Sequence, residues 1–216
     1  MTGDPPLDSA GEADASELAM FPLGSTVFPG QVVPLHIFED RYRTLIGRLT
    51  AGDADATFGI VLIERGHEVG GEDHRVSVAT RVEILQAEEF ADGRWGVVTA
   101  GLERLDNITW LEDDPYPRAM VRSRAVIDNG GGSLDDLETL LVDTIGLAAT
   151  AAGVEVPGPL EFNSDPQQRL DQLSALSPLT AFDRQAVLEA ATTADQIAIL
   201  HDALREKAML LRSELR

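Results

Sequence analysis

Hydrophobic and polar residues alternate over short stretches between residues 18 and 128. Val76, Val78, Val82 and Ile84 all fall on even positions, so an extended chain carries them on one face. Similar stretches predict seven strands, at residues 19–23, 32–37, 57–63, 76–90, 95–100, 104–110 and 118–126. This part of the chain is therefore predicted to consist mainly of strands.

One helix interrupts this pattern at residues 39–50. Phe38, Tyr42, Leu45 and Leu49 are spaced four, three and four positions apart, which places them on one face of a helix. A parallel sheet would need a crossover helix after nearly every strand. The single helix among short strands therefore favours a closed or half-closed β-barrel.

The pattern changes to the helical period after residues 130–132, three glycines that we expect to form a flexible joint. Capping residues and apolar spacing predict helices over 134–152, from 166 onward, over 181–191 and over 194–215. The expected caps are Ser133, Asp165 with Pro166, Thr180, and Thr193 in a capping box with Gln196, and Gly153 ends the first helix. The last helix has an apolar face formed by Ile197, Leu200, Leu204, Ala208, Leu211 and Leu215. These helices are predicted to form a bundle joined to the barrel.

Residues 1–17 differ from the rest, with five acids, no base and, after Met1, Leu7 as the only large apolar residue. Such a segment buries too little surface to offset its ordering entropy. The expected organisation is thus a disordered acidic tail over 1–17, a barrel over 18–128 and a helical bundle over 133–216, in the α+β class.

The charge of the chain excludes some functions. Its 216 residues include 17 Lys and Arg against 37 Asp and Glu, a formal charge of −20. This charge repels phosphate backbones, so nucleic-acid binding is not expected unless basic residues gather on one face. The arginines that would have to gather are Arg41, Arg43, Arg48, Arg118, Arg122 and Arg124.

Neither a membrane segment nor a leader is recognised. No apolar run approaches the ~20 residues of a membrane span, and the N-terminus lacks the basic flank and apolar stretch of a signal peptide. We therefore expect a cytoplasmic protein that does not contact a membrane.

Motifs for catalysis or metal binding are not found. Lys207 is the only lysine, which leaves no phosphate-binding loop, and the G-x-S-x-G motif of serine hydrolases and all cysteines are missing. The stretch at 67–74, HEVGGEDH, has two histidines and three acids, but its spacing and glycines favour a solvated loop over a metal site. No catalytic residue, metal or cofactor is expected.

Prolines are frequent between residues 20 and 46. Because proline cannot donate a hydrogen bond within a sheet, Pro22, Pro29 and Pro34 are expected at edges and corners of the barrel. An edge strand that stays open can bind an extended peptide by backbone pairing.

Three motifs in this stretch are FPL at 21–23, VFPG at 27–30 and PLHIFEDRY at 34–42. They resemble the start of the Lon protease N-terminal (substrate-binding) domain family, and weaker similarity continues at 58–62, 101–105 and 183–189. The resemblance implies a PUA-like β-barrel with one inserted helix, followed by a C-terminal α-helical bundle. It also implies a stand-alone form without the ATPase and protease parts of full-length Lon.

The leading hypothesis is a non-catalytic module that binds peptides or partner proteins in a groove near Phe28, Pro29, Pro34, His36 and Tyr42. For residues such as Phe28, Pro29 and Tyr42, building the corner and core of the barrel is the more common role. Candidate partners are unfolded polypeptides, a partner protein such as a protease, and a second copy of the chain in a homodimer. The alternatives are a peptidase or other hydrolase, and a PUA-like RNA-binding module.

Overall fold

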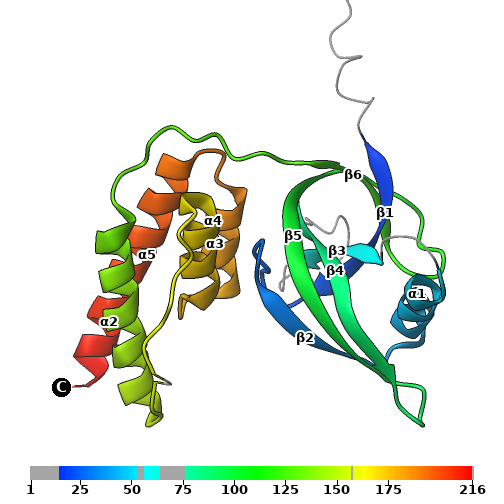
Figure 1. Cartoon of the computed structure of the whole chain (residues 1–216), viewed down its shortest axis with the longest axis horizontal. Coiled ribbons are helices and arrows are strands. Elements are labelled where there is room, and N and C mark those ends of the chain that lie inside the picture. The colour runs from blue at the N-terminus through cyan, green and yellow to red at the C-terminus, as the bar shows by residue number, and fades with distance from the viewer. Residues whose placement is uncertain (1–14, 53–55, 64–75, 157, 216) are drawn as a thin grey trace, which may run out of the picture.

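The computed structural model describes residues 15–52, 56–63, 76–156 and 158–215. A strand-rich part and a helical bundle lie side by side (Figure 1). The strand-rich part contains β1 (Ser16–Leu23), β2 (Val32–Ile37), α1 (Asp40–Ala51), β3 (Thr57–Leu62), β4 (Val78–Glu89), β5 (Trp95–Trp110) and β6 (Arg118–Ser123). The bundle contains α2 (Leu134–Ala152), α3 (Pro166–Leu176), α4 (Ala181–Glu189) and α5 (Thr193–Glu214).

The strands form one sheet that closes on itself through β5. The strand order is β2-β5-β4-β3-β1-β6, and β6 also pairs with β5. β1 and β3 are parallel, and the other described pairs are antiparallel. The first half of β5 pairs with β2 and the second half with β6. The sheet is therefore a barrel in which β2 has a single neighbour.

The two strands expected at 95–100 and 104–110 are one continuous strand, β5. The predicted gap is a β-bulge, because Arg81 pairs with Glu103 and Val82 with Gly101, which leaves Leu102 without a partner residue. A bulge bends a strand without ending it. The bend lets β5 pair with β2 over its first half and with β6 over its second half.

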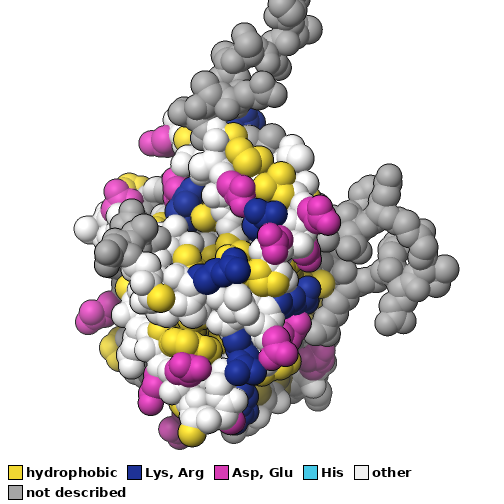
Figure 2. Space-filling view, turned by 90° about the vertical axis from the view of Figure 1, so that its right-hand side faces the viewer, with side chains coloured by type: hydrophobic (Ala, Val, Ile, Leu, Met, Phe, Trp, Pro, Cys, Tyr) yellow, Lys and Arg dark blue, Asp and Glu magenta, His cyan; other side chains and the backbone are white. Residues whose placement is uncertain are grey.

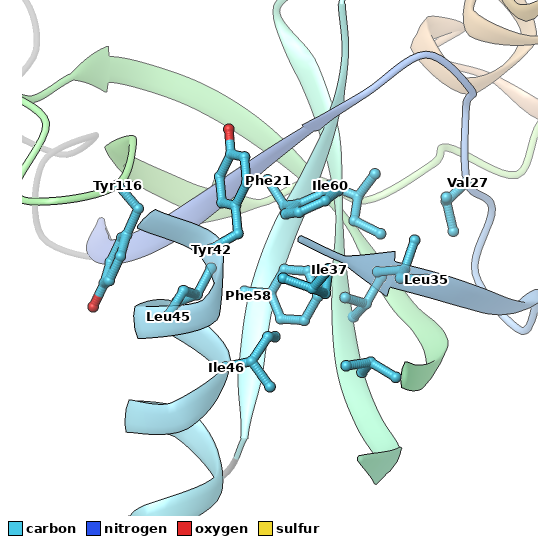
Figure 3. Close-up of a cluster of buried hydrophobic side chains, with 12 residues drawn as sticks. Phe21, Val27, Leu35, Ile37, Tyr42, Leu45, Ile46, Phe58, Ile60 and Tyr116 are labelled. Carbon is cyan, nitrogen blue, oxygen red and sulfur yellow. The ribbon is translucent and has the colours of Figure 1, made fainter. Parts of the chain in front are cut away.

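Helix α1 covers one opening of the barrel and completes its core. Tyr42, Leu45 and Ile46 are buried and point toward Phe21 and Phe58 of the strands (Figure 3). The centroids of the Phe21 and Tyr42 rings are 4.5 Å apart. Burial of large aromatic side chains of this kind is a major contribution to stability.

The prediction that Phe38 shares the inward face of this helix is wrong. Phe38 is 64% exposed. Glu39 is the N-cap, so Phe38 precedes the helix and follows the alternation of β2, in which Ile37 points inward and the next residue outward. The helical face instead includes Ile46, while Leu49 is partly buried against the core.

The bundle forms where the caps and apolar spacing predicted helices, with one shift. Pro166 is at the first helical position of α3, Thr180 and Asp183 form a capping box on α4, and Gly153 ends α2 at φ 67°. The predicted Thr193–Gln196 box on α5 is wrong, because Thr192 is the cap and accepts from Asp195 N. The Gln196 side chain is instead fully buried.

Most of the expected apolar face of α5 packs inside the bundle. Leu200, Leu204, Ala208 and Leu211 are buried, whereas Leu215 is 43% exposed at the helix end. The bundle core also receives Phe28 from the loop between β1 and β2. Barrel and bundle therefore share a hydrophobic core.

Candidate functional site

The structure separates the five residues of the expected groove into buried and exposed groups. Phe28 is 0% exposed inside the bundle core and Tyr42 is 4% exposed inside the barrel core. Pro29 is half-buried, whereas Pro34 and His36 are exposed on β2. A single groove lined by all five residues is therefore not formed, and Phe28 and Tyr42 are structural.

The exposed group continues along the outer face of β2. Residues alternate along this strand, so Leu35 and Ile37 point into the barrel while Pro34 and His36 point outward. Val32 is 58% exposed at the start of the strand, on the same outer face. Since Phe38 extends the row beyond the strand, four consecutive outward positions form one exposed strip.

Phe90 adds an aromatic ring from the turn between β4 and β5. Its ring centroid lies 6.2 Å from that of His36, and its ring covers Gly96 of β5. Arg94 Nη1 lies 3.2 Å from His36 Nε2, and the hydrogen bonds from Arg94 lower the pKa of Asp92. We call Val32, Pro34, His36, Phe38 and Phe90 the β2 surface.

The β2 surface combines apolar side chains with an available strand edge. Within the described sheet β2 pairs only with β5, so its other edge offers backbone groups to an incoming strand. A peptide that binds such an edge gains affinity from main-chain hydrogen bonds and specificity from its alternate side chains. The arrangement suits an extended chain that exposes apolar residues.

A groove lies next to this surface, between α1 and the β4–β5 hairpin. It has a volume of about 640 Å³ and is lined by Asp40, Arg43, Thr44, Gly47, Thr50, Ala51, Glu89 and Trp95. Glu89 and Trp95 are cross-strand partners, so their side chains share the face that looks toward α1. Figure 2 shows the side of the molecule on which α1 lies, where basic and acidic side chains stand next to one another.

Arg43 in this groove is already paired. Its Nη1 lies 3.0 Å from Asp40 Oδ1, and its guanidinium packs against the backbone of Gly93. Gly93 has φ 79°, and a side chain at this position would collide with Arg43. This contact holds α1 against the hairpin and keeps the groove in shape.

The interface between barrel and bundle contains a buried ion pair. Arg104 of β5 donates to Asp171 of α3, and both side chains are about 5% exposed or less. Burial raises the pKa of Asp171, because the loss of solvent outweighs the attraction of Arg104 and the hydrogen bond from Gln167. This ion pair links β5 to α3 within the interface.

No group of three or more metal-ligating side chains occurs within the part of the chain that the structure describes. The HEVGGEDH stretch at 67–74 lies entirely outside the described residues. Among the described helices, none has the length and apolar character needed to cross a membrane.

Sequence reasoning found part of the β2 surface and missed the groove. Extending the alternation of residues 32–37 by one position would have placed Phe38 outward. The groove has no such signal, because it joins a helix at 40–51 with residues 89 and 95 of a hairpin.

Known proteins resemble this chain along most of its length. The family model for the ATP-dependent protease La (LON) substrate-binding domain matches residues 17–206. Lon protease 1 of Herpetosiphon aurantiacus is 26% identical over 210 residues, and Lon protease of Heliobacterium modesticaldum is 25% identical over 205. These alignments cover 91% and 92% of this chain but 25% of each relative, so the chain spans about a quarter of their length.

Solved structures agree on the fold. The Lon N-terminal domain protein from Xanthomonas campestris has a TM-score of 0.59 at 21% identity, covering 88% of this chain and 96% of that one. The N-terminal domain of the Mycobacterium avium complex Lon protease has a TM-score of 0.56 at 18% identity, covering 88% and 99%. The family match over most of the residues establishes that this chain belongs to the LON substrate-binding domain family.

Proposed function

We propose that this domain binds extended segments of unfolded polypeptides at the β2 surface, and that its role is recognition rather than catalysis. The observation that carries the proposal is the exposed strip Val32, Pro34, His36 and Phe38 on a strand with one neighbour. The description of the family as substrate-binding supports the same conclusion.

The chemistry of the strip favours unfolded over folded partners. Val32 is 58% and Phe38 64% exposed, at the two ends of the strip, so the strip presents a large apolar side chain at each end. Folded proteins bury the residues that would match this strip, whereas unfolded chains expose them. Backbone pairing along β2 would add affinity that does not depend on sequence.

The arginines offer little support for RNA binding. Five of the six that would have to form a basic face lie beside carboxylates: Arg41 with Glu39, Arg43 with Asp40, Arg118 with Glu17, and Arg122 and Arg124 with Asp106. The sixth, Arg48, packs on the ring of Tyr116. Phosphates would have to displace these carboxylates in a chain whose charge is −20.

Fluorescence anisotropy tests the proposal with a labelled, reduced and carboxymethylated protein that cannot fold. The wild-type domain should bind this chain, and the native form of the same protein should not compete. Phe38→Ala should weaken binding about five- to tenfold, as expected for an exposed aromatic contact.

Phe182→Ala is the matched control, because Phe182 is 52% exposed on α4 and lies outside the β2 surface. It should bind as the wild type does. Equal affinities of both variants and the wild type would reject the β2 surface as the binding site.

A further inference from the structure

We infer that the groove between α1 and the β4–β5 hairpin accepts an arginine or lysine side chain of the bound polypeptide. The inference rests on the proposed function and adds a specificity to it. Its volume of about 640 Å³ falls within the range of ligand pockets, about 300–1,000 Å³.

Hydrogen-bond acceptors dominate the free polar groups of the groove. The carboxylate of Glu89 forms no ion pair or hydrogen bond with any residue that the structure describes. The hydroxyl of Thr44 donates to Asp40 O at 2.9 Å and that of Thr50 to Ile46 O at 2.8 Å. Each hydroxyl oxygen therefore keeps lone pairs that can accept from a ligand.

Arg43 is the one cation among the described residues that line the groove, and it is paired with a carboxylate. The guanidinium of Arg43 pairs with Asp40 and packs on Gly93. It therefore does not form an ion pair with Glu89. An entering ligand would therefore meet an unpaired carboxylate and free acceptors. A guanidinium or ammonium group satisfies both, whereas a carboxylate or a phosphate satisfies neither.

An aromatic side chain and a small residue also line the groove and suit a basic side chain. Trp95 lines the groove opposite α1, and an indole face attracts cations more strongly than other aromatic rings. Gly47 faces open space, since a Cβ built on it meets nothing within 4 Å. The long aliphatic stem of a basic side chain can lie in this space while its charged end reaches Glu89.

The groove borders the end of β2, on the opposite face of the sheet from Pro34 and His36. Trp95 is the pairing partner of Ile37, the last residue of β2, and Phe38 lies between that strand and the helix. The β4–β5 turn lies on the same side of the barrel as α1 (Figure 1). A chain bound along β2 reaches the groove by passing the strand end at Ile37, and the charge of −20 attracts basic chains.

Two peptides that differ in one heavy atom, a side-chain nitrogen replaced by oxygen, test the inference. Each is an extended apolar peptide with a central arginine or with citrulline, which is neutral and nearly isosteric. The wild-type domain should bind the arginine peptide about tenfold more tightly in anisotropy measurements. Glu89→Gln, which removes the charge, and Gly47→Leu, which fills the groove, should abolish this preference.

Matched controls separate these effects from changes in charge or folding. Glu206→Gln removes one exposed carboxylate on α5, and Gly146→Leu adds the same side chain to another helical glycine with open space around it. Both should keep the tenfold preference. Phe38→Ala should weaken both peptides equally, because it changes the β2 surface and not the groove.

An NMR titration tests the groove independently of peptide binding. N-acetylarginine methylamide should shift the Trp95 indole N–H signal in a saturable way, and the citrulline analogue should not. The inference is overturned if the arginine derivative leaves this signal in place, or if Glu89→Gln and Gly47→Leu keep the preference. If neither peptide nor unfolded protein binds while the Trp95 signal still shifts, the proposed function fails and the groove assignment holds.

Discussion

The phenylalanine of the loop at residues 24–31 and that of the neighbouring segment at 32–39 lie in opposite environments. Each segment contains a proline and a phenylalanine within a few positions. Phe28 is fully buried among the leucines of the bundle, whereas Phe38 is 64% exposed. The bundle covers the loop, whereas Pro34, His36 and Phe38 on the outer side of β2 stay exposed. Apolar residues of one short stretch therefore divide into a structural set and an exposed set according to what packs against them.

Hydrogen bonds from both parts of the molecule hold the loop in place. Thr26 Oγ1 donates to Ala181 O at 2.8 Å, and Thr80 Oγ1 donates to Val27 O at 2.6 Å. Arg184 Nη2 also donates to Ser25 Oγ at 2.8 Å, without a carboxylate partner among the described residues, and its desolvation lowers its pKa. The loop thus serves as the connection between barrel and bundle.

Replacing Phe28 should have the largest effect. Phe28→Ala leaves a cavity in the bundle core and should lower the free energy of unfolding by about 3–5 kcal/mol. Equilibrium unfolding in urea measures this value, with Phe38→Ala as the control. A loss for Phe28→Ala no larger than for the control would mean that the loop does not tie the two parts together.

A smaller effect is expected at the bulge that supports the loop. A Cβ on Gly101 would lie 2.2 Å from Phe28 O, and this carbonyl belongs to the backbone, which cannot move aside easily. Gly101→Ala should therefore cost about 1–3 kcal/mol, as overpacking does. Gly146→Ala, in an open position on α2, should not destabilise. Equal stability of the two variants would show that the loop can shift away from β5.

The smallest effect on stability is expected on the β2 surface. Phe38→Ala should change the free energy of unfolding by no more than about 0.5 kcal/mol, because its side chain lies mainly in solvent. The same variant should lose affinity for the unfolded protein in the anisotropy assay. Destabilisation by several kcal/mol would instead place Phe38 in the structural set with Phe28.

Local patterns in the sequence predicted much of the fold. The spacing of Tyr42 and Leu45 located α1, and Thr180 and Pro166 marked helix starts where the structure has them. These signals act over three or four residues and depend on backbone geometry alone. Errors occurred where two local signals competed: Phe38 fits both the helical spacing of α1 and the alternation of β2. They also occurred where two threonines, Thr192 and Thr193, could each cap the same helix.

The candidate site was less predictable than the fold. Pro34 and His36 were expected in a binding region and are exposed, whereas Phe28 and Tyr42 were expected there and are buried. All four belong to the same short stretch, so their positions in the sequence do not separate them. The groove beside Trp95 and Glu89 was not anticipated at all.

The sequence by itself determined the secondary structure, the acidic charge, and the membership of a family of barrels with a helical bundle. Only the tertiary structure decided which apolar residues are covered, because burial depends on segments distant in the chain. Phe28 is buried by helices more than 100 residues away, and the groove joins α1 to a hairpin some 40 residues further on. Packing of this kind is a property of the whole fold, and no local period encodes it.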